Sequence, residues 1–78
     1  MFATRQIALA EKILDACKDF GLMIATAESC TGGLIAACLT EVAGASKVFD
    51  RGFVTYHNCA KNVLLGVSKE LLNSKGAV

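Results

Sequence analysis

A short polar segment at residues 28–33, Glu-Ser-Cys-Thr-Gly-Gly, holds the residues best suited to chemistry. It lies between an apolar run and a predicted helix, so the Ser29 hydroxyl stands at the carboxyl end of a strand, where α/β sheets place their sites. Glycine lets the backbone approach a ligand closely, and the N–H groups of a helix start suit a phosphate or the oxyanion of a tetrahedral intermediate. An ordinary strand-to-helix turn with a Ser or Thr cap explains the same spacing, and both interpretations stay open.

A second segment, Tyr-His-Asn-Cys-Ala-Lys at residues 56–61, could supply a general base. If Asn58 caps a helix, Lys61 is the third helical residue, where the helix dipole disfavours a cation and favours the neutral amine. A neutral lysine beside a serine acts as the base in Ser–Lys hydrolases. The alternative is a solvated lysine on a short surface helix.

Three further candidates have weaker support. Cys30 lies at the same helix start, which favours a thiolate, so Cys30 and His57 form a rival pair of nucleophile and base. Arg51 either forms an exposed ion pair with Asp50 or binds a phosphate. Glu28 is either a carboxylate at the helix start or a group that orients its neighbours.

The spacing of apolar residues predicts the elements that position these segments. Alternation of helices and strands indicates the α/β class, and Gly52 marks a bulge or a close backbone approach in the second strand. The predicted elements are, in order, a helix between a cap at Thr4 and a stop at Gly21, a strand at 22–27, a helix at 31–42, a loop at 43–46, a strand at 48–56, a helix at 59–65 capped by Asn58 and ended by Gly66, and a helix capped by Ser68 and ended by Gly76.

The composition predicts that part of the surface of this chain is covered by another polypeptide segment. Of its 78 residues, 54% are hydrophobic and 19% are charged, against about 25% charged in typical soluble domains. A chain this short has much surface and little interior, so part of its apolar surface should meet a partner subunit or a further part of the domain. Residues 76–78, Gly-Ala-Val, resemble a helix stop and the start of a new strand, so we expect a domain that is incomplete at its C-terminal end.

Charge and cysteine content argue against several function classes. The net charge is +1, and the basic residues are interspersed with acidic ones and form no continuous basic stripe. We therefore expect no direct binding of nucleic acid. No apolar run approaches the ~20 residues that span a bilayer, so we expect no membrane insertion. The four cysteines show no C-x-x-C spacing and accompany a single histidine, so we expect no metal site. Because no secretory signal is visible, we expect reduced thiols and a cytoplasmic location.

Two motifs, taken together, resemble a known family. Residues 26–33 read Thr-Ala-Glu-Ser-Cys-Thr-Gly-Gly, and residues 51–56 read Arg-Gly-Phe-Val-Thr-Tyr, with Asn58 and Lys61 following at the right distance. These are similar to the signatures of the CinA C-terminal domain family, which includes stand-alone nicotinamide-nucleotide amidohydrolases. The resemblance implies helices layered on a mixed sheet, in a single domain over residues 1–78 that is markedly shorter than the family domain. It also implies hydrolysis of the carboxamide of nicotinamide mononucleotide, without a cofactor, to nicotinic acid mononucleotide and ammonia.

The resemblance further implies roles for individual residues. Ser29 matches the nucleophile, Lys61 its general base and Tyr56 a supporting hydroxyl. We expect a homo-oligomer with the small nucleotide as its ligand. The alternatives are a non-catalytic form that binds a nucleotide or a partner without turnover, and a cysteine hydrolase that uses Cys30. We expect the substrate to be bound by the motif residues Glu28, Cys30, Thr31, Gly32, Gly33, Arg51 and Asn58.

Overall fold

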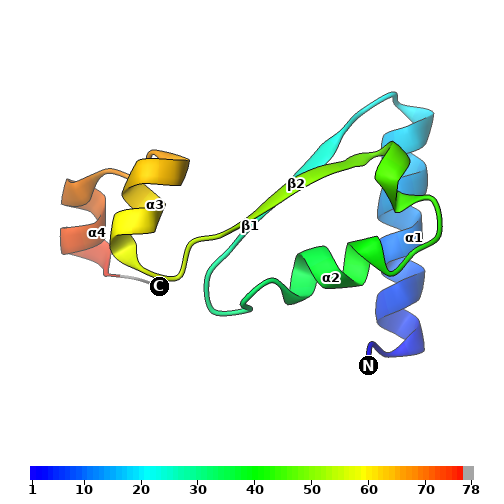
Figure 1. Cartoon of the computed structure of the whole chain (residues 1–78), viewed down its shortest axis with the longest axis horizontal. Helices are drawn as coiled ribbons and strands as arrows, with labels where there is room; N and C mark the ends of the chain where they lie inside the picture. Colours follow the sequence, from blue (N-terminus) through cyan, green and yellow to red (C-terminus); the bar gives the residue numbers. More distant parts are fainter. Residues whose placement is uncertain (77–78) are drawn as a thin grey trace.

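The computed structural model describes residues 1–76 and confirms the α/β class. Figure 1 shows the elements in the predicted order, with two final helices after the second strand. The strand start expected at residues 77–78 lies outside the described residues. No helix within residues 1–76 combines the length and apolarity needed to cross a membrane. The elements are α1 (Thr4–Asp19), β1 (Ile24–Glu28), α2 (Leu34–Thr40), the 3-10 turn η1 (Ala45–Lys47), β2 (Phe49–Val54), α3 (Asn58–Leu65) and α4 (Lys69–Lys75).

The start of α1 is capped from inside the helix. Its cap residue is Ala3 and not the predicted Thr4, because the Ala3 N–H donates to Oε1 of Gln6 at 2.8 Å. The predicted stop at Gly21 is confirmed, although the last helical residue lies two positions earlier. Gly21 has a φ of +66°, and the N–H of Leu22 donates to the carbonyl of Cys17 at 2.8 Å. This left-handed residue turns the chain toward β1.

The turn between β1 and α2 delays the second helix to Leu34, three residues later than predicted. Gly32 and Gly33 have φ values of +62° and +99°, which residues with a Cβ rarely adopt. The Gly32 N–H donates to the carbonyl of Ser29 at 3.0 Å and closes the turn. A right-handed helix cannot include these two residues, so it begins only after them.

The cap of α3 is His57, and the predicted cap at Asn58 is wrong by one residue. Nδ1 of His57 accepts a hydrogen bond from the backbone N–H of Cys59 at 3.2 Å. Asn58 is instead the first helical residue. The prediction followed the general preference for Asn as a cap, whereas the imidazole nitrogen of His57 accepts from the second helical residue in the way that a cap side chain does.

The signals around α4 are confirmed. Ser68 caps the helix, with its Oγ accepting from the N–H of Leu71 at 3.1 Å. Gly66 and Gly76 follow the last residues of α3 and α4 and have positive φ values. Local capping chemistry therefore positions both final helices as the sequence indicates.

β1 and β2 pair in parallel, as expected for strands joined by a helical crossover. The register shifts by one residue between Ile24 and Ala25, which leaves Asp50 as an extra residue of β2. We predicted a bulge or a close approach at Gly52. The bulge lies two residues earlier, and Gly52 is the close approach: a Cβ built there would lie 2.7 Å from Oγ1 of Thr26.

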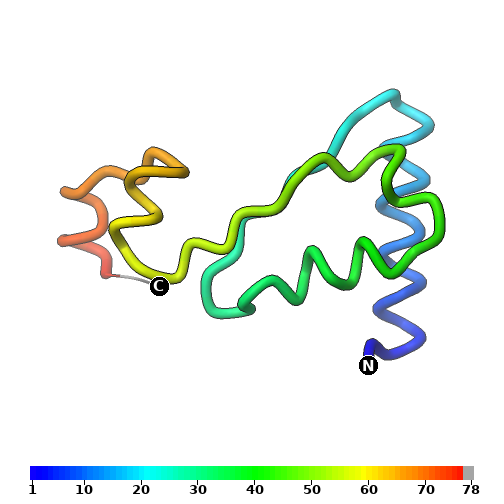
Figure 2. The backbone as a smooth tube through the Cα atoms, in the orientation of Figure 1, coloured from blue at the N-terminus to red at the C-terminus, as the bar shows by residue number. Residues whose placement is uncertain are grey.

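The core is small and lies on one face of the sheet. α1 and α2 cover that face, whereas α3 and α4 lie beyond the carboxyl ends of the strands (Figure 1; Figure 2). The radius of gyration of 14.4 Å exceeds the roughly 11.5 Å of a compact domain of this length. The described chain is thus an open body, in line with its surplus of apolar residues. The buried apolar residues are Ala10, Leu14, Leu39, Ala45 and Val48.

Replacing Gly52 with alanine should destabilise the chain by roughly 1–3 kcal/mol, the usual cost of overpacking. The new methyl group would lie 2.7 Å from Oγ1 of Thr26 and 3.3 Å from Cβ of Ala36. Urea unfolding followed by circular dichroism measures the loss. Because Oγ1 of Thr26 is buried and has no hydrogen-bond partner among the described residues, Thr26→Ala should recover most of that loss in the double variant. A Gly52→Ala variant as stable as the parent chain contradicts the close approach.

Candidate functional site

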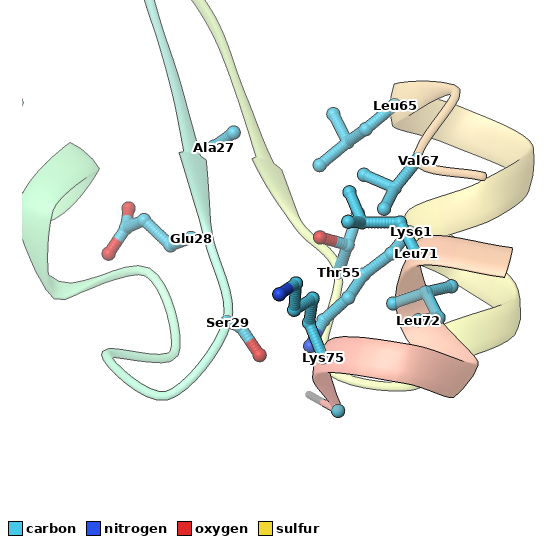
Figure 3. A pocket seen from close by; sticks show the side chains of 11 residues that line it. Ala27, Glu28, Ser29, Thr55, Lys61, Leu65, Val67, Leu71, Leu72 and Lys75 are labelled. Carbon is cyan, nitrogen blue, oxygen red and sulfur yellow. The ribbon is translucent and has the colours of Figure 1, made fainter. Parts of the chain in front are cut away.

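Ser29 directly follows β1 and lines a pocket of about 360 Å³. The pocket lies between the carboxyl ends of the strands and the helices α3 and α4, and the Ser29 hydroxyl is directed toward the helices (Figure 3). Leu65, Leu71 and Leu72 supply much of the apolar wall. A polar group in the lining of a mostly apolar pocket is typical of small-molecule sites.

Lys61 lines the same pocket and is largely buried, with 8% of its surface exposed. The alternative of a solvated lysine on a surface helix is therefore wrong. Because His57 rather than Asn58 caps α3, Lys61 is the fourth helical residue and not the third. Its burial in the pocket lining, rather than a place in the first turn, is what distinguishes it from an ordinary surface lysine.

Glu28 is the last residue of β1, and its carboxylate points to the opposite side, toward α2 (Figure 3). Oε1 accepts hydrogen bonds from the Thr31 hydroxyl at 2.7 Å and from the N–H of Ile35 at 2.8 Å. Oε2 accepts from the N–H of Ala36 at 2.9 Å. With 5% of its surface exposed, this carboxylate is an internal cap of α2.

These bonds correct the expectation that the start of α2 receives an anion from the substrate. The N–H groups of Ile35 and Ala36 already bind the Glu28 carboxylate. Of the two interpretations of Glu28, the helix-start carboxylate is therefore the one that the contacts favour. Glu28 still belongs to the pocket lining, but its carboxylate is hydrogen-bonded to the start of α2.

The environment of Glu28 lowers its pKa below the ordinary value. Burial alone would raise the pKa, because it disfavours the charged form. Hydrogen bonds from the N–H groups of Ala36 and Ile35, from the Thr31 hydroxyl and from the Gly33 backbone outweigh that effect. Glu28 therefore stays ionised at neutral pH and holds the β1–α2 turn in place.

Among the described residues of the pocket lining, the remaining ionisable side chains are amines. Besides Glu28, they are Lys61 and Lys75, which reach the pocket from α3 and from the last turn of α4. Figure 3 shows both lysines across from Ser29. Two amines in a mostly apolar pocket favour a ligand that carries negative charge or develops it during reaction.

Several predicted site residues lie outside this lining. Tyr56 is 73% exposed in the turn between β2 and α3. Arg51 forms an exposed ion pair, its Nε 2.7 Å from Oδ2 of Asp50, which is the simpler of its two interpretations. Asn58 is exposed at the start of α3. Their roles in binding or catalysis stay predictions.

The turn residues are used mainly for structure. Thr31 gives its hydroxyl to Glu28, and Gly32 and Gly33 supply the left-handed turn. Cys30 is exposed in that turn, and His57 caps α3 through Nδ1, so the contacts of the two residues favour no catalytic pair. Within residues 1–76, no three His, Cys, Asp or Glu side chains gather closely enough to hold a metal ion.

Sequence reasoning assigned no role to Thr55 or Lys75. Thr55 is 1% exposed, lines the pocket and donates its N–H to the carbonyl of Glu28 at 2.8 Å, which extends the strand pairing to the pocket edge. The signal for Thr55 was its place in the second motif. No local pattern pointed to Lys75, because only the packing of α4 brings it to the pocket.

Residues 6–78 match the model of a protein family described as CinA C-terminal domain. The chain is 56% identical over 70 residues to nicotinamide-nucleotide amidohydrolase PncC of Enterobacter agglomerans and 50% identical over 70 residues to PncC of Escherichia coli K12. These matches cover 90% of this chain, and 43% and 42% of the two relatives.

A solved structure shows the same arrangement of elements. The competence/damage inducible protein CihA from Agrobacterium tumefaciens superimposes with a TM-score of 0.96 at 55% sequence identity. The superposition covers 100% of this chain and 47% of that protein. The chain therefore spans less than half the length of each of these three relatives.

Proposed function

This chain belongs to the CinA C-terminal domain family, and we propose that it carries the nucleophile and the general base of a nicotinamide-nucleotide amidohydrolase. The resemblance indicated by the sequence motifs is confirmed at the level of the family. The proposed reaction is hydrolysis of the carboxamide of nicotinamide mononucleotide, which yields nicotinic acid mononucleotide and ammonia.

One observation carries this proposal: Ser29 and Lys61, far apart in sequence, line the same pocket, and Lys61 is buried there. Ser29 Oγ attacks the carboxamide carbon while the Lys61 amine accepts the hydroxyl proton. Collapse of the tetrahedral intermediate breaks the C–N bond, and Lys61 returns the proton to the departing ammonia. Water then cleaves the acyl ester on Ser29, which releases the carboxylate product and restores the hydroxyl.

The cationic lining supports a nucleotide as the substrate. Lys75 is exposed at the pocket, where its ammonium can meet the phosphate of the nucleotide. Because Glu28 takes the N–H groups of Ile35 and Ala36, other groups of the pocket must stabilise the oxyanion. Among the described side chains of the lining, Lys75, and Lys61 once it has accepted the proton of Ser29, can supply the positive charge that does so.

Ammonia release from nicotinamide mononucleotide tests the proposal, with Ser29→Ala and Cys30→Ala as a matched pair of adjacent substitutions. We expect Ser29→Ala to abolish release. Cys30→Ala should retain it and change KM more than kcat, since Cys30 is predicted to bind substrate and is exposed outside the pocket lining. Full-length E. coli PncC is the positive control. The opposite pattern would support the cysteine hydrolase and overturn the serine mechanism.

A second reading is that the chain binds the nucleotide without turning it over. The open body and the limited coverage of the relatives favour this reading for the chain on its own. Calorimetric titration with nicotinamide mononucleotide separates the two: binding by a folded chain that releases no ammonia favours the non-catalytic module. The supporting role of Tyr56, the homo-oligomer and the cytoplasmic location stay predictions.

A further inference from the structure

Within residues 1–76, α2 packs on one face of the sheet, and no element packs along the other face, which α3 and α4 approach only at the pocket beside Ala27. Parallel sheets are normally covered on both faces. A Cβ at Gly52 would meet Ala36 of α2, so Gly52 faces the helices that lie over the first face (Figure 1). Arg51 and Phe53 flank Gly52 and therefore face the opposite side, since side chains alternate along a strand. The register pairs them with Ala25 and Ala27, which are exposed.

The outer edge of β1 is also open within the described residues. The N–H of Ile24 donates to the carbonyl of Val48, and the carbonyl of Glu28 accepts from the N–H of Thr55. Both ends of β1 therefore direct their backbone groups toward the β2 side. Since successive residues of a strand point their N–H and C=O groups to opposite edges, those of Ala25 and Ala27 point to the outer edge.

The two edges of the sheet differ in how well they are protected. β2 carries a bulge at Asp50 and a charged pair between Asp50 and Arg51, both of which discourage pairing with another strand. β1 reads Ile-Ala-Thr-Ala-Glu, and its one charged side chain, Glu28, is turned inward to α2. β1 thus carries no extra residue and no outward charge, so its edge is the one that can accept a further strand.

The length of the relatives identifies what fits this edge. The whole chain superimposes on CihA with a TM-score of 0.96 yet covers 47% of that protein, so more than half of CihA lies outside the part that has this shape. We propose that the β1 edge and the sheet face of Ala25, Ala27 and Phe53 bind a complementing polypeptide, homologous to the part of the relatives that this chain does not match. That polypeptide adds a strand beside β1 and covers the face with apolar side chains.

The test uses the part of E. coli PncC that lies outside the matched 70 residues, produced as a separate polypeptide and titrated into this chain. We expect a one-to-one complex in analytical ultracentrifugation. Hydrogen exchange should slow at the amides of Ala25 and Ala27 on complex formation. The amide of Ile24, already bonded to Val48, serves as the internal reference. Neither complex formation nor hydrogen exchange depends on ammonia release, so a failure of this proposal can be distinguished from a failure of the proposed reaction.

Two lysine substitutions form a matched pair. Ala25→Lys places an ammonium on the face to be covered and should weaken the complex at least about tenfold, because burying an unpaired charge is costly. Ala43→Lys, in the exposed loop before η1, should leave binding unchanged. Absence of a complex overturns the proposal, as does a complex in which the amides of Ala25 and Ala27 exchange as fast as before. A dimer of this chain that protects the same amides and excludes the added polypeptide also overturns it.

Discussion

Replacing Lys61 with methionine should lower ammonia release from nicotinamide mononucleotide by about a hundred- to ten-thousandfold, the range associated with loss of a general base. Methionine keeps an unbranched, flexible side chain that can fill the same part of the pocket, but it cannot accept the proton of Ser29. Steady-state rates measure the effect, on the chain alone or, where turnover needs it, on its complex with the complementing polypeptide. Circular dichroism checks that the variant is folded.

Two controls separate the role of a base from the role of a cation. Lys61→Arg keeps a positive charge but removes the proton acceptor, since a guanidinium does not lose its proton in proteins. We expect this variant to be as inactive as Lys61→Met. Lys75→Met removes the exposed amine of the same pocket and should raise KM more than it lowers kcat. An active Lys61→Arg variant would assign Lys61 an electrostatic role and contradict the proposed base.

Replacing Glu28 with glutamine should destabilise the chain by roughly 2–3 kcal/mol at neutral pH, because hydrogen bonds to a charged group are stronger than neutral ones. The carboxylate of Glu28 holds the hydroxyl of Thr31 and the N–H groups of Ile35 and Ala36. Glutamine keeps one acceptor oxygen and replaces the other with a donor, which faces an N–H group. Urea unfolding measures the loss, and faster hydrogen exchange at Ile35 and Ala36 localises it.

The same carboxylate makes stability depend on pH in a predictable direction. The pKa of Glu28 is lowered in the folded chain, so the folded state binds this proton less readily than the unfolded state. Its contribution is fully present above the unfolded pKa of about 4.3 and is lost as the pH falls through the lower folded-state pKa. In Glu28→Gln, this part of the acid destabilisation should disappear.

Glu41 provides the matched control at the other end of the same helix. It is exposed at the C-terminal cap of α2, where the helix dipole disfavours a negative charge. Glu41→Gln should therefore leave stability unchanged or raise it slightly. If the two substitutions cost the same, the capping role of Glu28 is contradicted.

The sequence alone determined the order of the helices and strands, the glycine stops and the two segments that carry chemistry. The ends of both strands and of α2 differ from the predicted ends by one to three residues. Apolar periodicity and the stops at Gly21, Gly66 and Gly76 act between residues a few positions apart, so they can be read from the chain in order. The caps at Ala3 and His57 were missed because side chains outside the usual cap types make the capping bonds: Gln6 accepts from the N–H of Ala3, and His57 accepts from the N–H of Cys59. The places of Ser29 directly after β1 and of Lys61 near the start of α3 were predicted for the same local reasons.

Only the tertiary structure decided how the site residues are used. Strand pairing directs the Glu28 carboxylate toward α2. The N–H groups of Ile35 and Ala36, which the sequence left available to a substrate, therefore bind Glu28 instead. Packing of α4 brings Lys75 to the pocket, whereas Tyr56 and Arg51 stay outside its lining. The open β1 edge likewise follows from which strand pairs with which. These outcomes depend on contacts between distant segments, and the physical reason they escape a linear reading is that no residue's neighbours in sequence specify its neighbours across a sheet.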